Sequence, residues 1–172
     1  MNTTNKKGLV QEIKKQYTID QNMRRVWSEH DFSLDHYDAQ IDKQSESLVE
    51  KVLEKIGWPK QSQYGKNTPE ELWVLVQHLQ DIEIQKRALK EMRKLLPDEI
   101  DPKLIAKTTD RILIREGKKQ LYGTSFNINL EDNTLSVDPI EDSKNINKRR
   151  KELGLDTFEE QKKRAFDSFN NR

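Results

Sequence analysis

The sequence predicts a mainly α-helical single domain of about six helices with a small C-terminal β-hairpin. Apolar residues between positions 7 and 112 recur mostly at intervals of three or four, which is the period of an amphipathic helix. After Gly117 the pattern changes to alternation with β-branched and aromatic residues, which predicts strands. The 31 basic and 30 acidic residues nearly balance, as is typical of helices with alternating charges on their solvent faces.

Two helical stretches open the chain. Residues 7–30 and residues 41–56 each carry an apolar stripe at helical spacing. The segment 30–38, HDFSLDHYD, interrupts the pattern and is predicted as a loop or a short turn. Gly57 and Pro59 end the second stretch, because glycine often closes a helix and proline cannot continue one.

The main helix is predicted to run from Thr68 to about Leu95, after a loop over residues 61–67 and before Pro97. Thr68 has the features of an N-cap, since Pro69 follows at the first helical position and Glu71 is three residues after the cap. By the same logic, Asp101 and Pro102 begin the next helix.

The C-terminal part combines the hairpin with two short helices. QLYGTSFNINL (120–130) and TLSVDPI (134–140) are the predicted strands, and EDN (131–133) is their turn. Ser143 is predicted to cap a helix that Gly154 stops. Thr157, with Glu160 at the third position, caps the last helix, and residues 170–172 are expected to fray.

Composition excludes several classes of function. The chain has no cysteine, which rules out disulfides, cysteine-bound zinc and thiol catalysis. It has neither a signal-peptide core nor the roughly 20 apolar residues that a membrane span needs, so we expect a cytoplasmic protein without membrane contact. A net charge of +1 disfavours nucleic acid as partner, and glycine-rich phosphate loops are absent, so no cofactor is expected.

A first polar cluster lies within LWVLVQHLQD (72–81). On a continuous helix, His78, Asp81 and Gln85 share one face, since their spacing is three and four. Asp81 would then hold the His78 ring for acid–base chemistry. The alternative is a structural histidine with one satisfied hydrogen bond.

A second cluster follows about 40 residues later. Asp110 and Arg111 adjoin at the end of a helix, and Gln120, Tyr122 and Thr124 would point the same way on a strand. An amide, a phenol and a hydroxyl on one face can all bind a ligand. The alternative is an ordinary hairpin with a polar outer face.

Two further segments carry weaker signals. His30 and His36 are six residues apart, which fits neither a helix face nor a strand face, so a metal site is not expected there or at His78. NKRRKEL (147–153) is interpreted as a solvated helix face, with phosphate contact through Lys148 to Lys151 as the minor alternative.

Taken together, these motifs resemble a bacterial family, domain of unknown function 6624. The resemblance rests on GWP (57–59), Gly65, LVQHLQD (75–81), DR (110–111), QLYGT (120–124), DPIED (138–142) and RRKELGL (149–155) in this order. It covers roughly residues 40–158 and implies no activity. The sequence departs from the family pattern at Ser125 and Ser45. Residues 1–39 are therefore interpreted as an N-terminal helical extension, 40–158 as the core domain and 159–172 as a C-terminal helix and tail.

Our leading hypothesis is a small-molecule enzyme or ligand-binding domain in which both clusters line one pocket. Arg111 would bind an anionic ligand as carboxylate or phosphate. The expected catalytic residues are His78, Asp81, Arg111 and Tyr122, and the expected substrate-binding residues are Gln77, Gln85, Asp110, Gln120 and Thr124. The rival hypothesis is a protein-interaction module, such as an effector, inhibitor or immunity-like protein, that binds a protein partner without catalysis.

Overall fold

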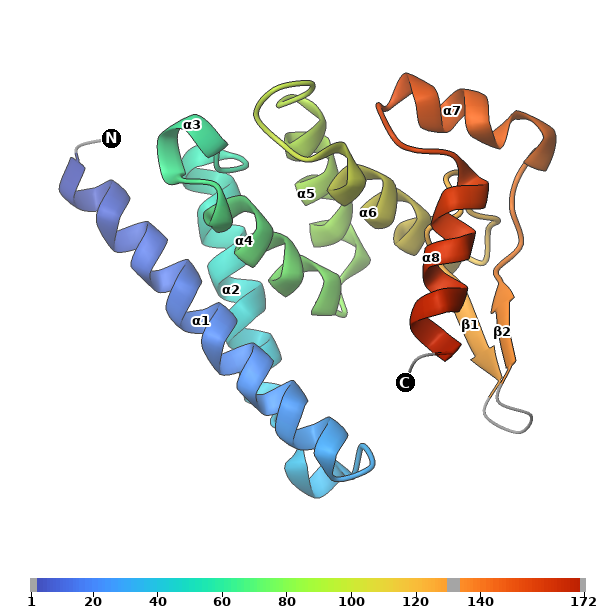
Figure 1. The fold of residues 1–172 in the computed structure, drawn as a ribbon. Coiled ribbons are helices and arrows are strands. Elements are labelled where there is room, and N and C mark those ends of the chain that lie inside the picture. The colour runs from blue at the N-terminus through green and yellow to red at the C-terminus, as the bar shows by residue number, and fades with distance from the viewer. Residues whose placement is uncertain (1–2, 130–133, 171–172) are drawn as a thin grey trace. The chain divides into compact units, whose positions relative to one another are not determined.

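The computed structural model describes residues 3–129 and 134–170 and is mostly helical (Figure 1). This part of the chain contains eight α-helices and one two-stranded antiparallel sheet. The predicted mainly α fold with a C-terminal hairpin is therefore confirmed. The chain divides into two compact units, Met1–Ile100 and Asp101–Arg172. Within the described residues, no helix is long and apolar enough to cross a membrane.

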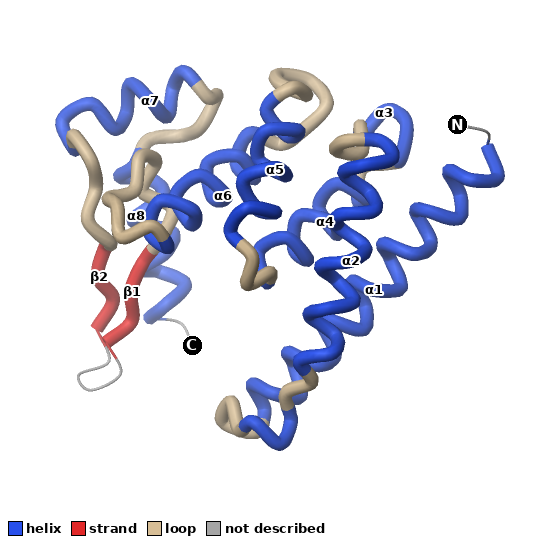
Figure 2. Tube along the Cα trace, turned by 180° about the vertical axis from the view of Figure 1, so that it is seen from behind, coloured by secondary structure: helices blue, strands red, loops and turns tan. Residues whose placement is uncertain are grey.

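The first unit is entirely helical (Figure 2). Its elements are α1 (Thr3–Glu29), the 3-10 helix η1 (Leu34–His36), α2 (Ala39–Ile56), α3 (Gln61–Tyr64), α4 (Asn67–His78) and α5 (Ile82–Arg93). Helix α1 packs against α2 and α4, and α2 also contacts α5. Their apolar stripes meet in a core that includes Ile13, Val49, Val52, Leu72, Leu75 and Met92, all fully buried.

The predicted main helix is broken in its middle. Helix α4 ends at His78, Leu79 is extended, and Asp81 caps the new helix α5 by accepting hydrogen bonds from the N–H groups of the next turn. The Gln85 amide donates to the carbonyls of Val76 (2.9 Å) and Leu79 (3.2 Å) and so ties α5 to the end of α4. The prediction of one helix to residue 95 is wrong, and His78, Asp81 and Gln85 do not share a helical stripe.

The start of α4 also differs from the prediction. Residues 61–64 form the short helix α3 instead of a loop, and α4 already begins at Asn67. Because α3 directly precedes it, the Thr68 hydroxyl donates to the Tyr64 carbonyl (2.8 Å). The structure shows no cap bond from Thr68 to α4, so the prediction of Thr68 as N-cap is wrong.

The second unit combines three helices with the hairpin. Its elements are α6 (Pro102–Arg115), β1 (Phe126–Asn129), β2 (Thr134–Val137), η2 (Ser143–Asn145), α7 (Ile146–Glu152) and α8 (Phe158–Asn170). Asp101 caps α6 by accepting from the Lys103 N–H (2.8 Å), as predicted. The capping box of Thr157 and Glu160 at α8 is confirmed in both directions.

The hairpin is shorter than predicted. β1 pairs with β2 from Phe126 opposite Val137 to Asn129 opposite Thr134, and the predicted turn at 131–133 lies outside the described residues, as do 171 and 172 of the predicted frayed end. Residues 121–125 form a loop, while Gln120 makes an isolated bridge to Ile140. The expected common strand face of Gln120, Tyr122 and Thr124 is therefore wrong. Ser143 begins a 3-10 turn and caps no α-helix.

Candidate functional site

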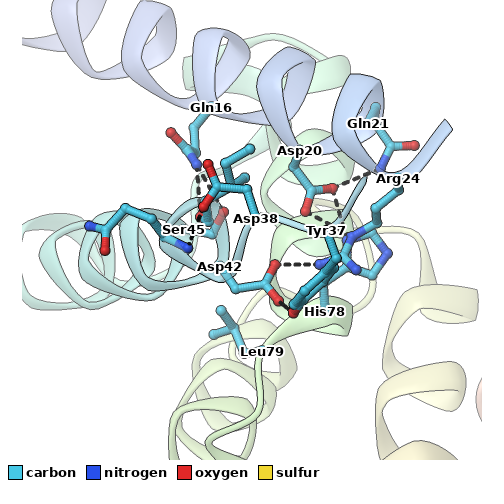
Figure 3. Close-up of polar contacts among 12 residues, drawn as sticks. Gln16, Asp20, Gln21, Arg24, Tyr37, Asp38, Asp42, Ser45, His78 and Leu79 are labelled. Carbon is cyan, nitrogen blue, oxygen red and sulfur yellow. Dashed lines mark hydrogen bonds and ion pairs between the residues drawn. The ribbon is translucent and has the colours of Figure 1, made fainter. Parts of the chain in front are cut away.

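His78 lies in a polar cluster of the first unit that joins α1, α2 and α4 (Figure 3). Its Nδ1 is 2.9 Å from the Oδ2 of Asp20, a residue with no exposed surface. Arg24, one helical turn after Asp20 on α1, places its Nε 2.9 Å from Asp20 Oδ1 and 2.8 Å from His78 Nδ1. The Asp20 carboxylate thus bridges an imidazole and a guanidinium.

The geometry assigns the ring proton of His78. Nδ1 has one site, so it cannot accept from Arg24 and donate to Asp20 at once. Arg24 Nε carries a single hydrogen, and the charged Asp20 Oδ1 is its stronger acceptor. In the tautomer with its single ring proton on Nδ1, Nδ1–H donates to Asp20 Oδ2 and Nε2 carries a lone pair. Across residues 3–129 and 134–170, the structure shows no hydrogen bond to Nε2, and 25% of the side chain is exposed.

A second carboxylate completes the surroundings of Arg24. Its Nη2 donates to Asp42 Oδ1 at 2.5 Å, and the Tyr37 hydroxyl donates to the other Asp42 oxygen. This hydrogen bond, followed by burial, raises the pKa of Tyr37 above its usual value, so the phenol remains a donor at neutral pH. Arg24 is therefore held from two sides, which fixes Asp20 and the His78 ring in turn.

Asp20 is ionised in this cluster. Burial by itself raises the pKa of its carboxyl group, but hydrogen bonds from His78 and Gln21 and the charges of His78 and Arg24 act in the opposite direction. The net result is a pKa below the ordinary 3.8. A buried carboxylate that stays charged at neutral pH can orient a histidine and stabilise a proton on it.

Asp81, the residue we expected beside His78, caps α5 instead. The actual partner, Asp20, is 58 residues before His78. Asp20 and Arg24 are four residues apart on a predicted helix, but the same spacing is shared by ordinary exposed ion pairs such as Arg25 with Glu29. Spacing alone could therefore not have identified the pair.

The two glutamines expected to bind substrate are both buried in the first unit. Gln77 lies on α4 with 7% of its surface exposed. Gln85 has no exposed surface, and its amide nitrogen holds the break between α4 and α5. Its Oε1 is buried and has no hydrogen-bond partner among the described residues. Gln85 thus has a structural role, which the pattern of residues could not distinguish from ligand binding.

In the second unit, Asp110 organises the loop 121–124. Its carboxylate has no exposed surface and accepts from the N–H groups of Leu121 (2.7 Å) and Tyr122 (3.0 Å). It also accepts from the N–H (3.0 Å) and the hydroxyl (2.8 Å) of Thr124. These bonds use the polar atoms of both Asp110 and the Thr124 side chain, so their observed role is to fix this loop.

Gln120 is equally engaged by the chain. It has no exposed surface, its Oε1 accepts from the Ser125 N–H (2.9 Å), and its amide nitrogen donates to the carbonyls of Ser125 (3.1 Å) and Asp138 (2.7 Å). The amide therefore joins the start of the hairpin to its end.

Two arginines hold the same loop through its carbonyls. Arg150 is 2% exposed and donates to the carbonyls of Tyr122 (2.5 Å) and Asp156 (2.6 Å). Arg149 donates to the Leu121 carbonyl (3.0 Å). The interpretation of NKRRKEL as a solvated face is wrong for these two residues, although Lys148 and Lys151 are exposed.

Arg111 and Tyr122 remain the second unit's candidate ligand contacts. Arg111 is exposed on α6, and the Tyr122 side chain is half-buried. His78 belongs to Met1–Ile100 and these two residues to Asp101–Arg172, so a common pocket stays a prediction. Among the described residues, no group of three or more His, Asp or Glu side chains is placed to hold a metal ion.

Comparison with known proteins identifies the family. A model described as a family of unknown function, DUF6624, matches residues 7–171. The chain belongs to this family. No curated protein and no solved structure matches it.

The extent of the DUF6624 match changes the interpretation of the N-terminus. The match begins at residue 7, so α1 belongs to the family's sequence and is not an addition peculiar to this protein. This agrees with the geometry, because α1 contributes Asp20 and Arg24 to the His78 cluster. The match also includes the whole of α8.

Proposed function

We propose that this DUF6624 member is a small-molecule enzyme or ligand-binding protein in which His78 acts as general base or acid. Asp20 takes the orienting role that we first expected of Asp81. One observation carries the proposal: the buried Asp20 carboxylate occupies Nδ1 of a partly exposed histidine, while Nε2 makes no hydrogen bond to the described residues. A general base needs such a free, oriented nitrogen.

The chemistry follows from this arrangement. Nε2 would take a proton from a substrate hydroxyl, amine or activated water, and the Asp20 carboxylate would stabilise the resulting imidazolium. Arg24 keeps the carboxylate in place through its bond of 2.9 Å. Arg111 and Tyr122 belong to the second unit, and their role as ligand contacts stays a prediction from the sequence.

Nitrogen-15 NMR of the imidazole rings tests the first step. A free neutral histidine prefers its proton on Nε2, whereas the Asp20 bond requires it on Nδ1. We expect the Nδ1–H tautomer at His78 in the wild type and its loss in Asp20→Asn. A proton on Nε2 in the wild type would contradict the proposal.

A substrate screen tests the second step. The wild type, His78→Gln and Asp20→Asn are compared against a panel of small carboxylates, phosphate esters and acyl esters, by turnover and by thermal shift. General-base catalysis typically contributes about 10²- to 10⁴-fold, so turnover should fall by that factor in His78→Gln. His30→Gln is the matched control, since this exposed ring lies outside the cluster. Equal turnover or binding in all variants would refute the role of His78.

A protein-interaction module is the second candidate function. The observation that favours it is an exposed apolar pair, Phe32 with 61% and Leu34 with 78% of its surface accessible.

A further inference from the structure

The segment between α1 and α2, residues 30–36, forms an apolar tip. Among the described residues, the exposed large apolar side chains are Phe32 and Leu34, and both lie here. Single exposed apolar residues are common on protein surfaces, but two within one short turn form a patch.

The backbone of the tip is held in an unusual conformation. Asp31 and Phe32 have φ angles of 51° and 58°, in the left-handed region that side chains other than glycine rarely adopt. The Phe32 N–H donates to the Trp27 carbonyl (2.9 Å), and the Phe32 ring meets the Trp27 ring edge-on at 5.1 Å. Such strain persists where the surroundings enforce it, and it is concentrated at binding sites. The tip is therefore a built, preorganised feature.

The tip is also acidic. Asp31 and Asp35 are exposed, and neither side chain makes an ion pair or hydrogen bond to the part of the chain that the structure describes. The two carboxylates flank the apolar pair. A partner must therefore offer an apolar cavity with a basic rim.

The first unit itself contains such a cavity. It has a volume of about 520 Å³ and lies where the C-terminal ends of α2 and α5 meet α3. Its apolar lining includes Ile56, Trp58 and Leu95. Its rim carries Lys55, Lys60 and Lys94. Lys94 pairs with the lining glutamate, Glu91, at 2.6 Å, and Lys60 interacts with the charge of Glu99 next to the cavity. The three lysines still outnumber these two glutamates, so the rim keeps a net positive charge.

The loop that forms the tip precedes α2, and α3, which contributes to the cavity lining, follows it at the other end of α2 (Figures 1 and 2). The tip directly precedes Ala39, and the cavity begins at Lys55. At 1.5 Å per residue, these 18 residues of α2 separate them by about 27 Å. One copy therefore cannot fill its own cavity.

We propose that the protein self-associates head to tail, with the tip of one copy inserted into the lysine-rimmed cavity of a second copy. Phe32 fills the apolar lining, and Asp31 and Asp35 meet the rim lysines. Because the two surfaces differ, the contact is heterologous, and it closes into a ring or continues as a chain. A membrane is the poorer occupant, since acidic side chains are repelled by anionic lipid headgroups. The proposal does not depend on the His78 site.

Sedimentation velocity from micromolar to millimolar concentration tests this contact. We expect concentration-dependent association of the wild type that weakens with salt. Burial of a phenylalanine side chain stabilises by about 1.5–3 kcal/mol, so Phe32→Ser should weaken association about ten- to hundredfold. Lys60→Glu should weaken it comparably, while Lys14→Glu, an exposed lysine on α1, should leave it unchanged. Circular dichroism verifies that each variant is folded.

Mixing the variants gives the decisive result. Phe32→Ser keeps an intact cavity and Lys60→Glu keeps an intact tip, so an equimolar mixture should form a one-to-one dimer and nothing larger. A wild type that stays monomeric to millimolar concentration would overturn the proposal. Association unaffected by both variants, no heterodimer in the mixture, or binding of the monomer to phosphatidylglycerol vesicles would overturn it as well.

Discussion

Replacing Asp20 by asparagine tests the centre of the His78 cluster with little change of shape. Asp20 accepts from His78 Nδ1 (2.9 Å), Arg24 Nε (2.9 Å) and Gln21 Nε2 (2.8 Å) and has no exposed surface. Hydrogen bonds to charged groups each contribute about 1.5–3 kcal/mol. Arg24 and His78 are partly exposed, and Arg24 still has its ion pair with Asp42 after the substitution. Each lost hydrogen bond should therefore cost a value near the lower end of this range. We expect Asp20→Asn to lower the free energy of unfolding at pH 7 by about 3 kcal/mol.

The loss should depend on pH in a defined direction. The pKa of Asp20 is lower in the folded protein than its ordinary value of 3.8, so folding favours the ionised carboxyl group. Its stabilising contribution is therefore complete above the unfolded pKa and disappears as the pH falls through the folded pKa. The difference between wild type and Asp20→Asn should be largest near neutrality and shrink below pH 3.8.

Urea denaturation followed by tryptophan fluorescence measures the stability of the first unit, Met1–Ile100. All three tryptophans, Trp27, Trp58 and Trp73, lie within Met1–Ile100, so their signal reports the unit that contains Asp20. Asp98→Asn is the control, because Asp98 is exposed in the same unit. A difference below about 1 kcal/mol at pH 7, or one independent of pH, would refute the assigned hydrogen bonds.

Two predictions concern the second unit. Asp110→Ala leaves four hydrogen-bond donors of the loop 121–124 without their acceptor. We expect the free energy of unfolding to fall by at least about 3 kcal/mol and amide hydrogen exchange at Leu121, Tyr122 and Thr124 to become faster. Unchanged exchange would show that water replaces the carboxylate. Gly123→Ala places a Cβ 2.6 Å from the Phe158 ring at φ +69°, whereas Gly154→Ala has a similar φ of +72° and no neighbour within 4 Å. Thermal denaturation should show Gly123→Ala to be less stable than Gly154→Ala by about 1–3 kcal/mol, and equal losses would mean that only backbone strain matters.

Features determined within a few residues could be predicted from the sequence alone. Apolar spacing located α1, α2 and α6, and the caps at Asp101 and Thr157 are as expected. The physical reason is that these hydrogen bonds connect neighbours along the chain, so the sequence itself contains both partners. The hairpin was predicted from its local alternation, but its first strand is shorter, since the N–H groups of Leu121, Tyr122 and Thr124 donate to Asp110.

Only the tertiary structure determined the features that depend on contacts between residues far apart in the sequence. The apolar period continues from α4 into α5, yet the helix breaks, because Asp81 caps a new helix and the buried Gln85 amide bonds to the carbonyls of Val76 and Leu79. His78 likewise binds Asp20, 58 residues away, because α1 packs against α4. Sequence spacing predicts which residues share a face of one helix. Packing of the helices determines which residue of another helix lies opposite that face. A carboxylate such as that of Asp20 can be buried only where several hydrogen-bond donors surround it.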